Sequence, residues 1–84
     1  MMNKVLVILY VPIIEKEYNC FIPKNKKIQN VINLLVRAIY EMNDNNFDLE
    51  YNHTLYMKDT GKEIAKNIRV KDSSIMNATE LILI

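Results

Sequence analysis

The sequence predicts an α+β domain in which one long helix packs across one face of a mixed β-sheet. Strand-like apolar runs stand near its two ends, at Lys4–Val11 and Glu80–Ile84. Between them, Lys27–Met42 has apolar residues at helical spacing, and the short alternating segments on either side of it can form hairpins. Two hairpins and one helix bury their apolar faces together when they form two layers. A chain of 84 residues has the size of one domain, so we expect residues 1–84 to form a single unit.

The first two elements are expected to form an antiparallel hairpin. Lys4–Val11 is rich in β-branched residues and apolar on both sides, which is typical of a central strand with both faces covered. Pro12 has no backbone N–H, so the strand should end there. Glu17–Ile22 should return beside it, because a short connection favours antiparallel pairing, and Pro23 should end this second strand.

The one clear helix is predicted over Lys27–Met42. Its apolar residues recur at i, i+3, i+4 and i+7 and form one stripe: Ile28, Val31, Ile32, Leu35, Ala38, Ile39 and Met42. Asn25 is the expected N-cap, because its side-chain oxygen can accept a hydrogen bond from an unpaired amide of the first turn. Lys24, Lys26 and Lys27 form a small basic cluster there, which is expected to be solvated, with contact to an acidic partner as the alternative.

The segment after the helix allows two interpretations. Asn43–Asn46 should end the helix, because Asn and Asp tolerate turn conformations. Residues 43–53 are then either a short strand or a loop anchored by Phe47, Leu49 and Tyr51. His53 is expected to be a solvated loop residue.

The second half of the chain is predicted to end in the middle of the sheet. Thr54–Lys58 alternates as a strand, and Gly61 should adopt a positive φ in the turn that leads to a very short return strand at Glu63 and Ile64. Lys71–Ser74 can form a brief helical turn. The expected anchors of the irregular segment are Ile68, Val70, Ile75 and Met76. Because the first and last strands are the most apolar, placing them side by side in the centre buries the most surface.

Composition excludes several classes of protein. The net charge of +1 gives no general reason to expect nucleic acid, and no run approaches the roughly 20 apolar residues of a membrane-spanning helix. We therefore expect no nucleic acid, no membrane insertion, no signal peptide and a cytoplasmic location. One cysteine and one histidine provide no zinc set, and no cofactor is expected. Cys20 is expected to be a buried structural thiol rather than a nucleophile, so an enzyme is disfavoured.

Two stretches carry a resemblance to the β-grasp fold of ubiquitin. Tyr18–Ile39 resembles its second strand, proline-containing turn and helix, with Tyr18, Cys20 and Ile22 at inward positions. Leu55–Ile84 resembles its second half, including Gly61-Lys62 and a closing Leu81-x-Leu83. The resemblance implies a roll with a mixed sheet of four to five strands and one long helix. Within this superfamily the chain is most similar to the small YukD-like proteins, which are associated with type VII (WXG-type) secretion in Gram-positive bacteria.

The resemblance implies a protein-binding accessory of that secretion system rather than an enzyme. Ubiquitin and the sulfur carriers act through a flexible C-terminal Gly-Gly tail, whereas this sequence ends on Ile84 within a predicted strand. A non-conjugated interaction module is therefore expected, and a protein modifier or sulfur carrier is the disfavoured alternative. The partner's identity and the oligomeric state are left open, as is the choice between a protein that acts alone and a counterpart of a larger machine's domain.

The outer face of the sheet is the predicted protein-binding surface. If Leu81 and Leu83 face the helix, alternation along the strand turns Ile82 and Ile84 away from it. One side of the first strand joins them, either Val5/Val7/Leu9 or Leu6/Ile8/Tyr10, and the ubiquitin register favours the first set. The predicted protein-binding residues are Val7, Leu9, Tyr56, Lys58, Ile82 and Ile84. A contiguous exposed apolar surface usually marks an interface, here with a foreign protein or with a second copy of the chain.

Overall fold

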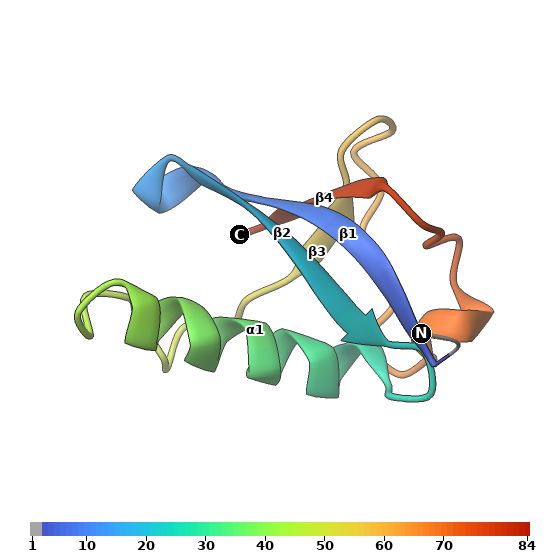
Figure 1. Ribbon diagram of the computed structural model, residues 1–84, viewed down its shortest axis with the longest axis horizontal. Coiled ribbons are helices and arrows are strands. Elements are labelled where there is room, and N and C mark those ends of the chain that lie inside the picture. Colours follow the sequence, from blue (N-terminus) through green and yellow to red (C-terminus); the bar gives the residue numbers. More distant parts are fainter. Residues whose placement is uncertain (1–2) are drawn as a thin grey trace.

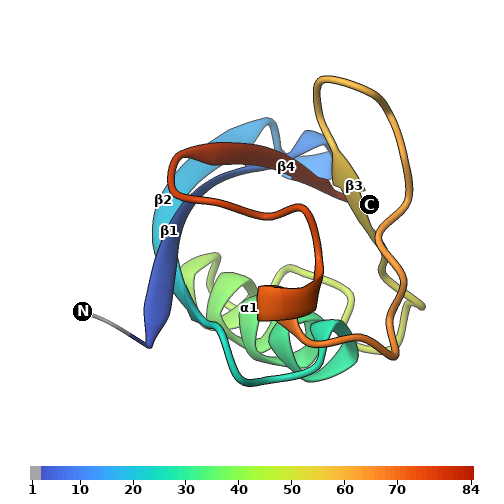
Figure 2. The same ribbon diagram turned by 90° about the vertical axis from the view of Figure 1, so that its right-hand side faces the viewer.

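The computed structural model describes residues 3–84, which fold into a four-stranded sheet with one α-helix beneath it (Figure 1). The elements are β1 (Lys4–Val11), β2 (Lys16–Pro23), α1 (Ile28–Met42), β3 (Leu55–Met57) and β4 (Thr79–Leu83), with short 3-10 helices at Pro12–Ile14 and Val70–Asp72. Seen end-on, the sheet curves over the helix (Figure 2). The predicted α+β class and the helix across a mixed sheet are confirmed.

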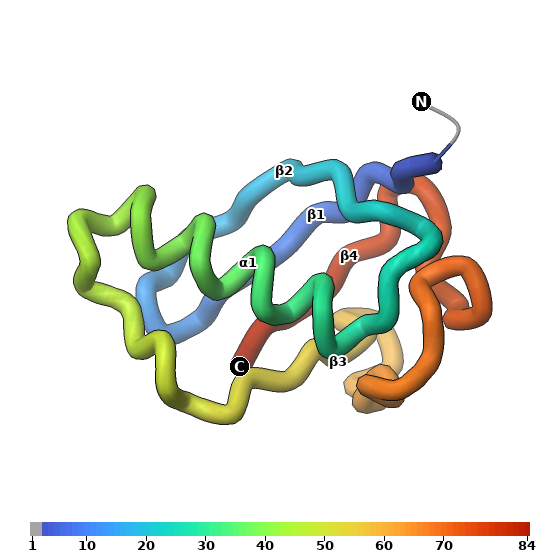
Figure 3. Tube along the Cα trace, turned by 90° about the horizontal axis from the view of Figure 1, so that it is seen from below, coloured from blue at the N-terminus to red at the C-terminus, as the bar shows by residue number. Residues whose placement is uncertain are grey.

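The sheet has the strand order β2-β1-β4-β3. β1 pairs with β4 in parallel, with Leu9 opposite Leu81, and the two outer pairs are antiparallel. This confirms that the first and last strands lie side by side in the centre. A parallel pair requires a long crossover, and here α1 crosses the sheet within that connection (Figure 3).

The β1–β2 connection shows how proline ends the first strand. Pro12 opens a 3-10 turn, and Glu15 closes it in the left-handed region at φ 52°. The Glu15 amide donates to the Pro12 carbonyl over 3.0 Å. β2 then returns in antiparallel register, with Lys16 opposite Val11.

The helix begins differently from the prediction. Asn25 is not the N-cap; Lys27 takes that position without a side-chain capping bond. The Ile28 amide instead donates to the Ile68 carbonyl (2.8 Å), and the Gln29 amide donates to the Lys66 carbonyl (3.0 Å). A distant backbone segment therefore pairs the first-turn amides that a side-chain cap would otherwise satisfy.

The core lies between the sheet and α1. The helix buries Ile28, Val31, Ile32, Val36 and Ile39. Val36, which was not predicted, lies between Ile32 and Ile39 on this stripe. Ala38 and Met42, which were predicted to belong to the stripe, are exposed. The buried residues of the sheet and connections that join these five are Val5, Val7, Leu9, Val11, Ile22, Phe47, Leu55, Ile64, Val70, Ile75, Leu81 and Leu83.

Residues 43–54 form a loop rather than a strand. Of its three expected anchors only Phe47 is buried, while Leu49 and Tyr51 are exposed. His53 is buried, so the prediction that it is solvated was wrong. Its ring stacks on Phe47 at 4.9 Å between centroids and meets the edge of Tyr51 at 5.1 Å. The loop is therefore held by an aromatic cluster in which the His53 ring contacts both Phe47 and Tyr51.

The segment that leads to β4 follows the prediction with two exceptions, and the first is that Glu63 forms only an isolated bridge with Tyr56 where a very short return strand was expected. The 3-10 helix Val70–Asp72 supplies the expected helical turn, and Gly61 has the expected positive φ of 72°. Val70 and Ile75 are buried, but Met76 is 69% exposed and anchors nothing.

Candidate protein-binding surface

β1 is apolar on both sides, and the structure decides which side is inside. Val5, Val7, Leu9 and Val11 are buried against the helix. The prediction that Val7 and Leu9 belong to the outer face was therefore wrong. Val7 lies opposite Cys20 and Leu9 lies opposite Leu81, and both partners belong to the helix side of the sheet. Because cross-strand partners share a face of the sheet, β1 has to present these residues inward.

The other side of β1 faces away from the helix and is half-buried at Leu6, Ile8 and Tyr10. Leu6 lies opposite Phe21 of β2, whose side chain is 58% exposed. Tyr10 lies opposite Ile82, which in turn lies opposite Tyr56. We call these residues the outer-face patch: Leu6, Ile8, Tyr10, Phe21, Tyr56 and Ile82. All four strands contribute to it.

β4 confirms the predicted alternation. Leu81 and Leu83 are buried, Ile82 is half-buried on the opposite side, and Ile84 is 52% exposed. Ile84 exchanges two backbone hydrogen bonds with Thr54, with N···O distances of 2.7 and 3.0 Å. It is therefore held at the end of the sheet.

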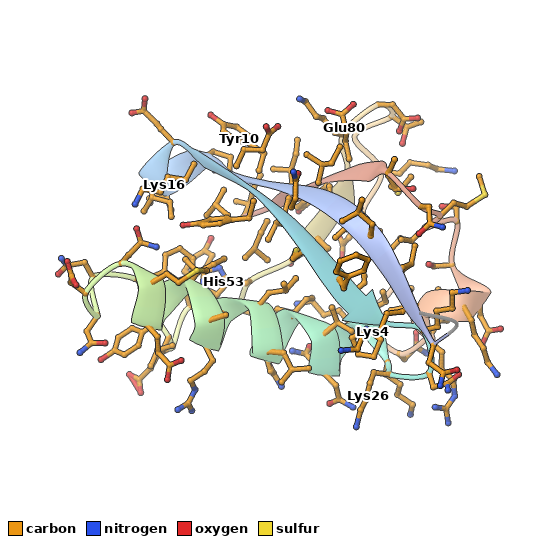
Figure 4. All side chains as sticks on the ribbon, in the orientation of Figure 1. Lys4, Tyr10, Lys16, Lys26, His53 and Glu80 are labelled. Carbon is orange, nitrogen blue, oxygen red and sulfur yellow. The ribbon has the colours of Figure 1, made fainter. Side chains whose placement is uncertain are left out.

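An ion pair flanks the patch beside Ile8. Lys58 and Glu80 approach to 3.2 Å, and about half of each side chain is exposed, at 46% and 51%. Glu80 lies opposite Ile8 and is placed with Tyr10 on the side of the sheet away from the helix (Figure 4). A pair this exposed contributes little to stability. Its position beside Ile8 gives a partner a polar contact next to the apolar surface.

The side chains that could carry chemistry are engaged in packing. Cys20 is half-buried on the inner side of β2, and burial raises the pKa of its thiol, which therefore stays protonated at neutral pH. His53 Nε2 lies 2.8 Å from the Asp48 carbonyl oxygen and donates to it, while its buried Nδ1 has no partner among residues 3–84. In the same range no group of three His, Cys, Asp or Glu side chains is placed to hold a metal ion. No helix there has the length and apolar character to span a membrane.

Four patch residues were missed by the prediction, although one signal was available. Tyr18, Cys20 and Ile22 were correctly expected to face inward, and alternation then turns Phe21 outward. Antiparallel pairing brings Phe21 opposite one side of β1, and that side must be the outer one. The four are Phe21, which was not considered, and Leu6, Ile8 and Tyr10, which were the alternative set that the ubiquitin register did not favour.

Solved structures with the same fold include ubiquitin-like domains, one of them from a type VII secretion system protein. The EccD5 ubiquitin-like domain from Mycobacterium xenopi is 11% identical, covers 96% of this chain and 92% of its own, and has a TM-score of 0.76. The ubiquitin-like domain of Mycobacterium tuberculosis ECCD1 is also 11% identical, with 96% and 97% coverage and a TM-score of 0.75. A chain of the MycP5-free ESX-5 inner membrane complex has a TM-score of 0.78 at 9% identity over 98% of this chain. Neither a protein-family model nor a curated protein matches the chain.

These likenesses show that the fold is the ubiquitin-like β-grasp. The chain spans about a fifth (21%) of the length of the ESX-5 component and nearly all of the two isolated domains. At these identities the likeness extends to the backbone arrangement, and function has to be argued from the surface.

Proposed function

We propose that this protein is a ubiquitin-like, non-enzymatic interaction module that acts as a cytoplasmic accessory of a bacterial type VII secretion system. The observation that carries the proposal is the outer-face patch. Six apolar or aromatic side chains from all four strands gather on the one sheet face that the helix leaves uncovered. An apolar surface of this kind, with polar residues such as Asn19 and Glu80 beside it, is typical of a protein interface.

Two further observations support the link to secretion. The chain resembles YukD-like proteins in sequence, and one of the similar solved structures is a domain of a protein named as a type VII secretion system protein. Another similar structure belongs to an inner membrane complex, so a membrane-bound secretion component is the partner we propose. A second copy of the chain is the other candidate, because the patch is continuous enough to pair with itself.

The alternative of a protein modifier or sulfur carrier makes a different chemical demand. Conjugation requires a C-terminal carboxylate that can enter an activating enzyme. Ile84 is paired with Thr54 on both its N–H and its C=O, so the backbone is held in the sheet as far as this residue. Mass spectrometry of the protein purified from its own cells separates the two functions, because conjugation would add the mass of a target.

The central test places a charge in the outer-face patch. Ile82→Lys should leave the thermal unfolding curve close to that of the wild type, since Ile82 is only half-buried. It should reduce chemical crosslinking to the secretion component, or dimer formation, by about tenfold, the usual effect of disrupting the centre of an interface. Crosslinking in cells that produce the protein measures binding to the secretion component. Light scattering of the purified protein measures dimer formation.

Asn30→Lys is the matched control, because Asn30 is exposed on the helix and far from the outer face. It should change neither measurement. The proposal fails if Ile82→Lys forms the same complexes as the wild type, or if both variants lose them equally.

A further inference from the structure

One end of the molecule collects positive charge from three separate segments of the chain. Figure 2 looks onto this end, and Figure 4 labels Lys4 and Lys26 there. We call it the basic end, and its cations are Lys4, Lys24, Lys26, Lys27, Arg69 and Lys71. The sequence shows three of these as a local cluster, and folding brings the other three beside them.

Backbone hydrogen bonds hold the three segments together. The Lys24 amide donates to the Asn3 carbonyl over 2.8 Å, and the Lys71 amide donates to the Lys24 carbonyl over 3.0 Å. Lys27 and Arg69 form an antiparallel bridge, and the Arg69 guanidinium donates to the Asn25 carbonyl. The backbone contacts of Lys24, Lys27 and Lys71 hold the segments together without their side chains, and only Arg69 adds a side-chain bond.

These cations have little internal compensation. Asp72 is the only carboxylate in the segments 3–4, 24–27 and 69–72. Within residues 3–84 the ion pair found is Lys58–Glu80, which lies on the sheet and involves none of the six. Carboxylates gather instead near the opposite end of α1 and the neighbouring loops, among them Glu41, Asp44 and Asp48. The charge is thus separated although the net charge is only +1.

A groove of about 300 Å³ opens between two of these lysines. Its lining combines Lys24, Lys71 and the polar Asn77 with four apolar side chains. Of the apolar lining residues, Val5, Val70 and Ile75 are buried and form the floor, while Met76 is 69% exposed. The groove therefore offers two ammonium groups beside an apolar surface.

We propose that this groove binds an acidic segment of a partner protein, in which a carboxylate lies next to an apolar side chain. The two lysines complement the carboxylate, and the buried floor with Met76 covers the apolar side chain. A concave site between the cations admits a narrow, protruding segment. A bilayer surface and a nucleic-acid duplex are broad, and neither would fill the apolar floor.

The test uses fluorescence anisotropy with a labelled peptide of alternating Glu and Leu as the probe. The wild-type protein should bind it, and added salt should weaken the binding because the contacts are partly ionic. A peptide of alternating Glu and Ser should bind more weakly by about tenfold, the value of one apolar side chain in a pocket. No binding of either peptide, or equal binding of both, would overturn the proposal.

Two double variants with the same change of charge locate the site. Lys24→Glu/Lys71→Glu should weaken peptide binding by about tenfold or more, because both groove cations become repulsive. Arg37→Glu/Lys62→Glu, at exposed positions outside the groove, is the control and should bind as the wild type does. If both variants weakened peptide binding equally, the effect would come from net charge alone, and the proposal of a defined groove would be contradicted. Circular dichroism checks that each variant is folded.

Other ligand classes are separated by the same assay. A short DNA duplex or anionic phospholipid vesicles that bind more tightly than the Glu-Leu peptide would overturn the proposal in favour of a phosphate-bearing partner. Ile82→Lys should bind the peptide as well as the wild type does, because Ile82 lies outside the groove. The groove proposal and the outer-face proposal can therefore fail independently.

Discussion

Ile8 and Leu9 are neighbours on β1 with side chains of the same size, yet they occupy opposite environments. Leu9 is 1% exposed beneath α1, while Ile8 is half-buried on the outer face beside the Lys58–Glu80 pair. The same contrast runs along β4 between Leu83 and Ile82. Residue type does not distinguish the two faces of the sheet; the single helix does, because it covers only one of them.

This contrast separates folding from binding. Fully burying an aliphatic side chain stabilises a protein by about 1.5–3 kcal/mol. The inner face has this contribution already in the free protein, whereas the outer face is left with half-buried side chains that a partner can cover. Substitutions at neighbouring positions on the two faces therefore test which residues belong to the core and which to the binding surface.

The largest effect is expected from Leu83→Lys. It places an ammonium group where the leucine is 1% exposed, at a cost of about 4 kcal/mol or more. The total stability expected for 84 residues is only about 4–13 kcal/mol. The variant should therefore be largely unfolded by circular dichroism, while Ile82→Lys stays folded. Equal unfolding of the two would contradict the assignment of β4's faces.

A smaller effect is expected from removing side-chain volume on β1. Leu9→Ala should lower the free energy of unfolding by about 2–5 kcal/mol, because it leaves a cavity in the core. Ile8→Ala should lower it by about 1 kcal/mol or less, since solvent can fill the space. Urea denaturation of both variants gives the comparison. A larger loss in Ile8→Ala would mean that the outer face is already packed against something in the free protein.

The smallest effect is expected for the alkylation rate of Cys20. Its thiol is on the inner side of an edge strand and half-buried, and burial raises its pKa. A raised pKa leaves less thiolate at any pH below it, so alkylation by iodoacetamide at pH 8 should be slower than for the unfolded protein. The rate should rise as the pH is increased towards that raised pKa. A native rate equal to that in urea would show that the thiol is fully accessible.

The candidate site was only partly predictable, and β1 shows why. On β4 the polar Glu80 and the paired leucines distinguish the two sides in the sequence, so Leu81 and Leu83 were correctly predicted to face the helix and Ile82 to face away from it. On β1 every residue from Val5 to Val11 is apolar or aromatic, so alternation alone cannot say which side is inner. The resemblance to ubiquitin was used to choose the outer side of β1, and it placed Val7 and Leu9 on the wrong face. Tyr56 and Lys58 do lie on the outer side, as their pairing with Ile82 and Glu80 shows.

The order of the main strands and the helix could be predicted from the sequence, because apolar periodicity and the prolines that end strands act locally. The bounds of β1 and the central place of Glu80–Ile84 follow from it. The tertiary structure alone decided the inner face of β1, the capping of α1 by the Lys66 and Ile68 carbonyls, and the burial of His53. It also assembled the basic end from three segments. Each of these depends on contacts between residues far apart in the chain, and neither periodicity nor local propensity carries information about such contacts.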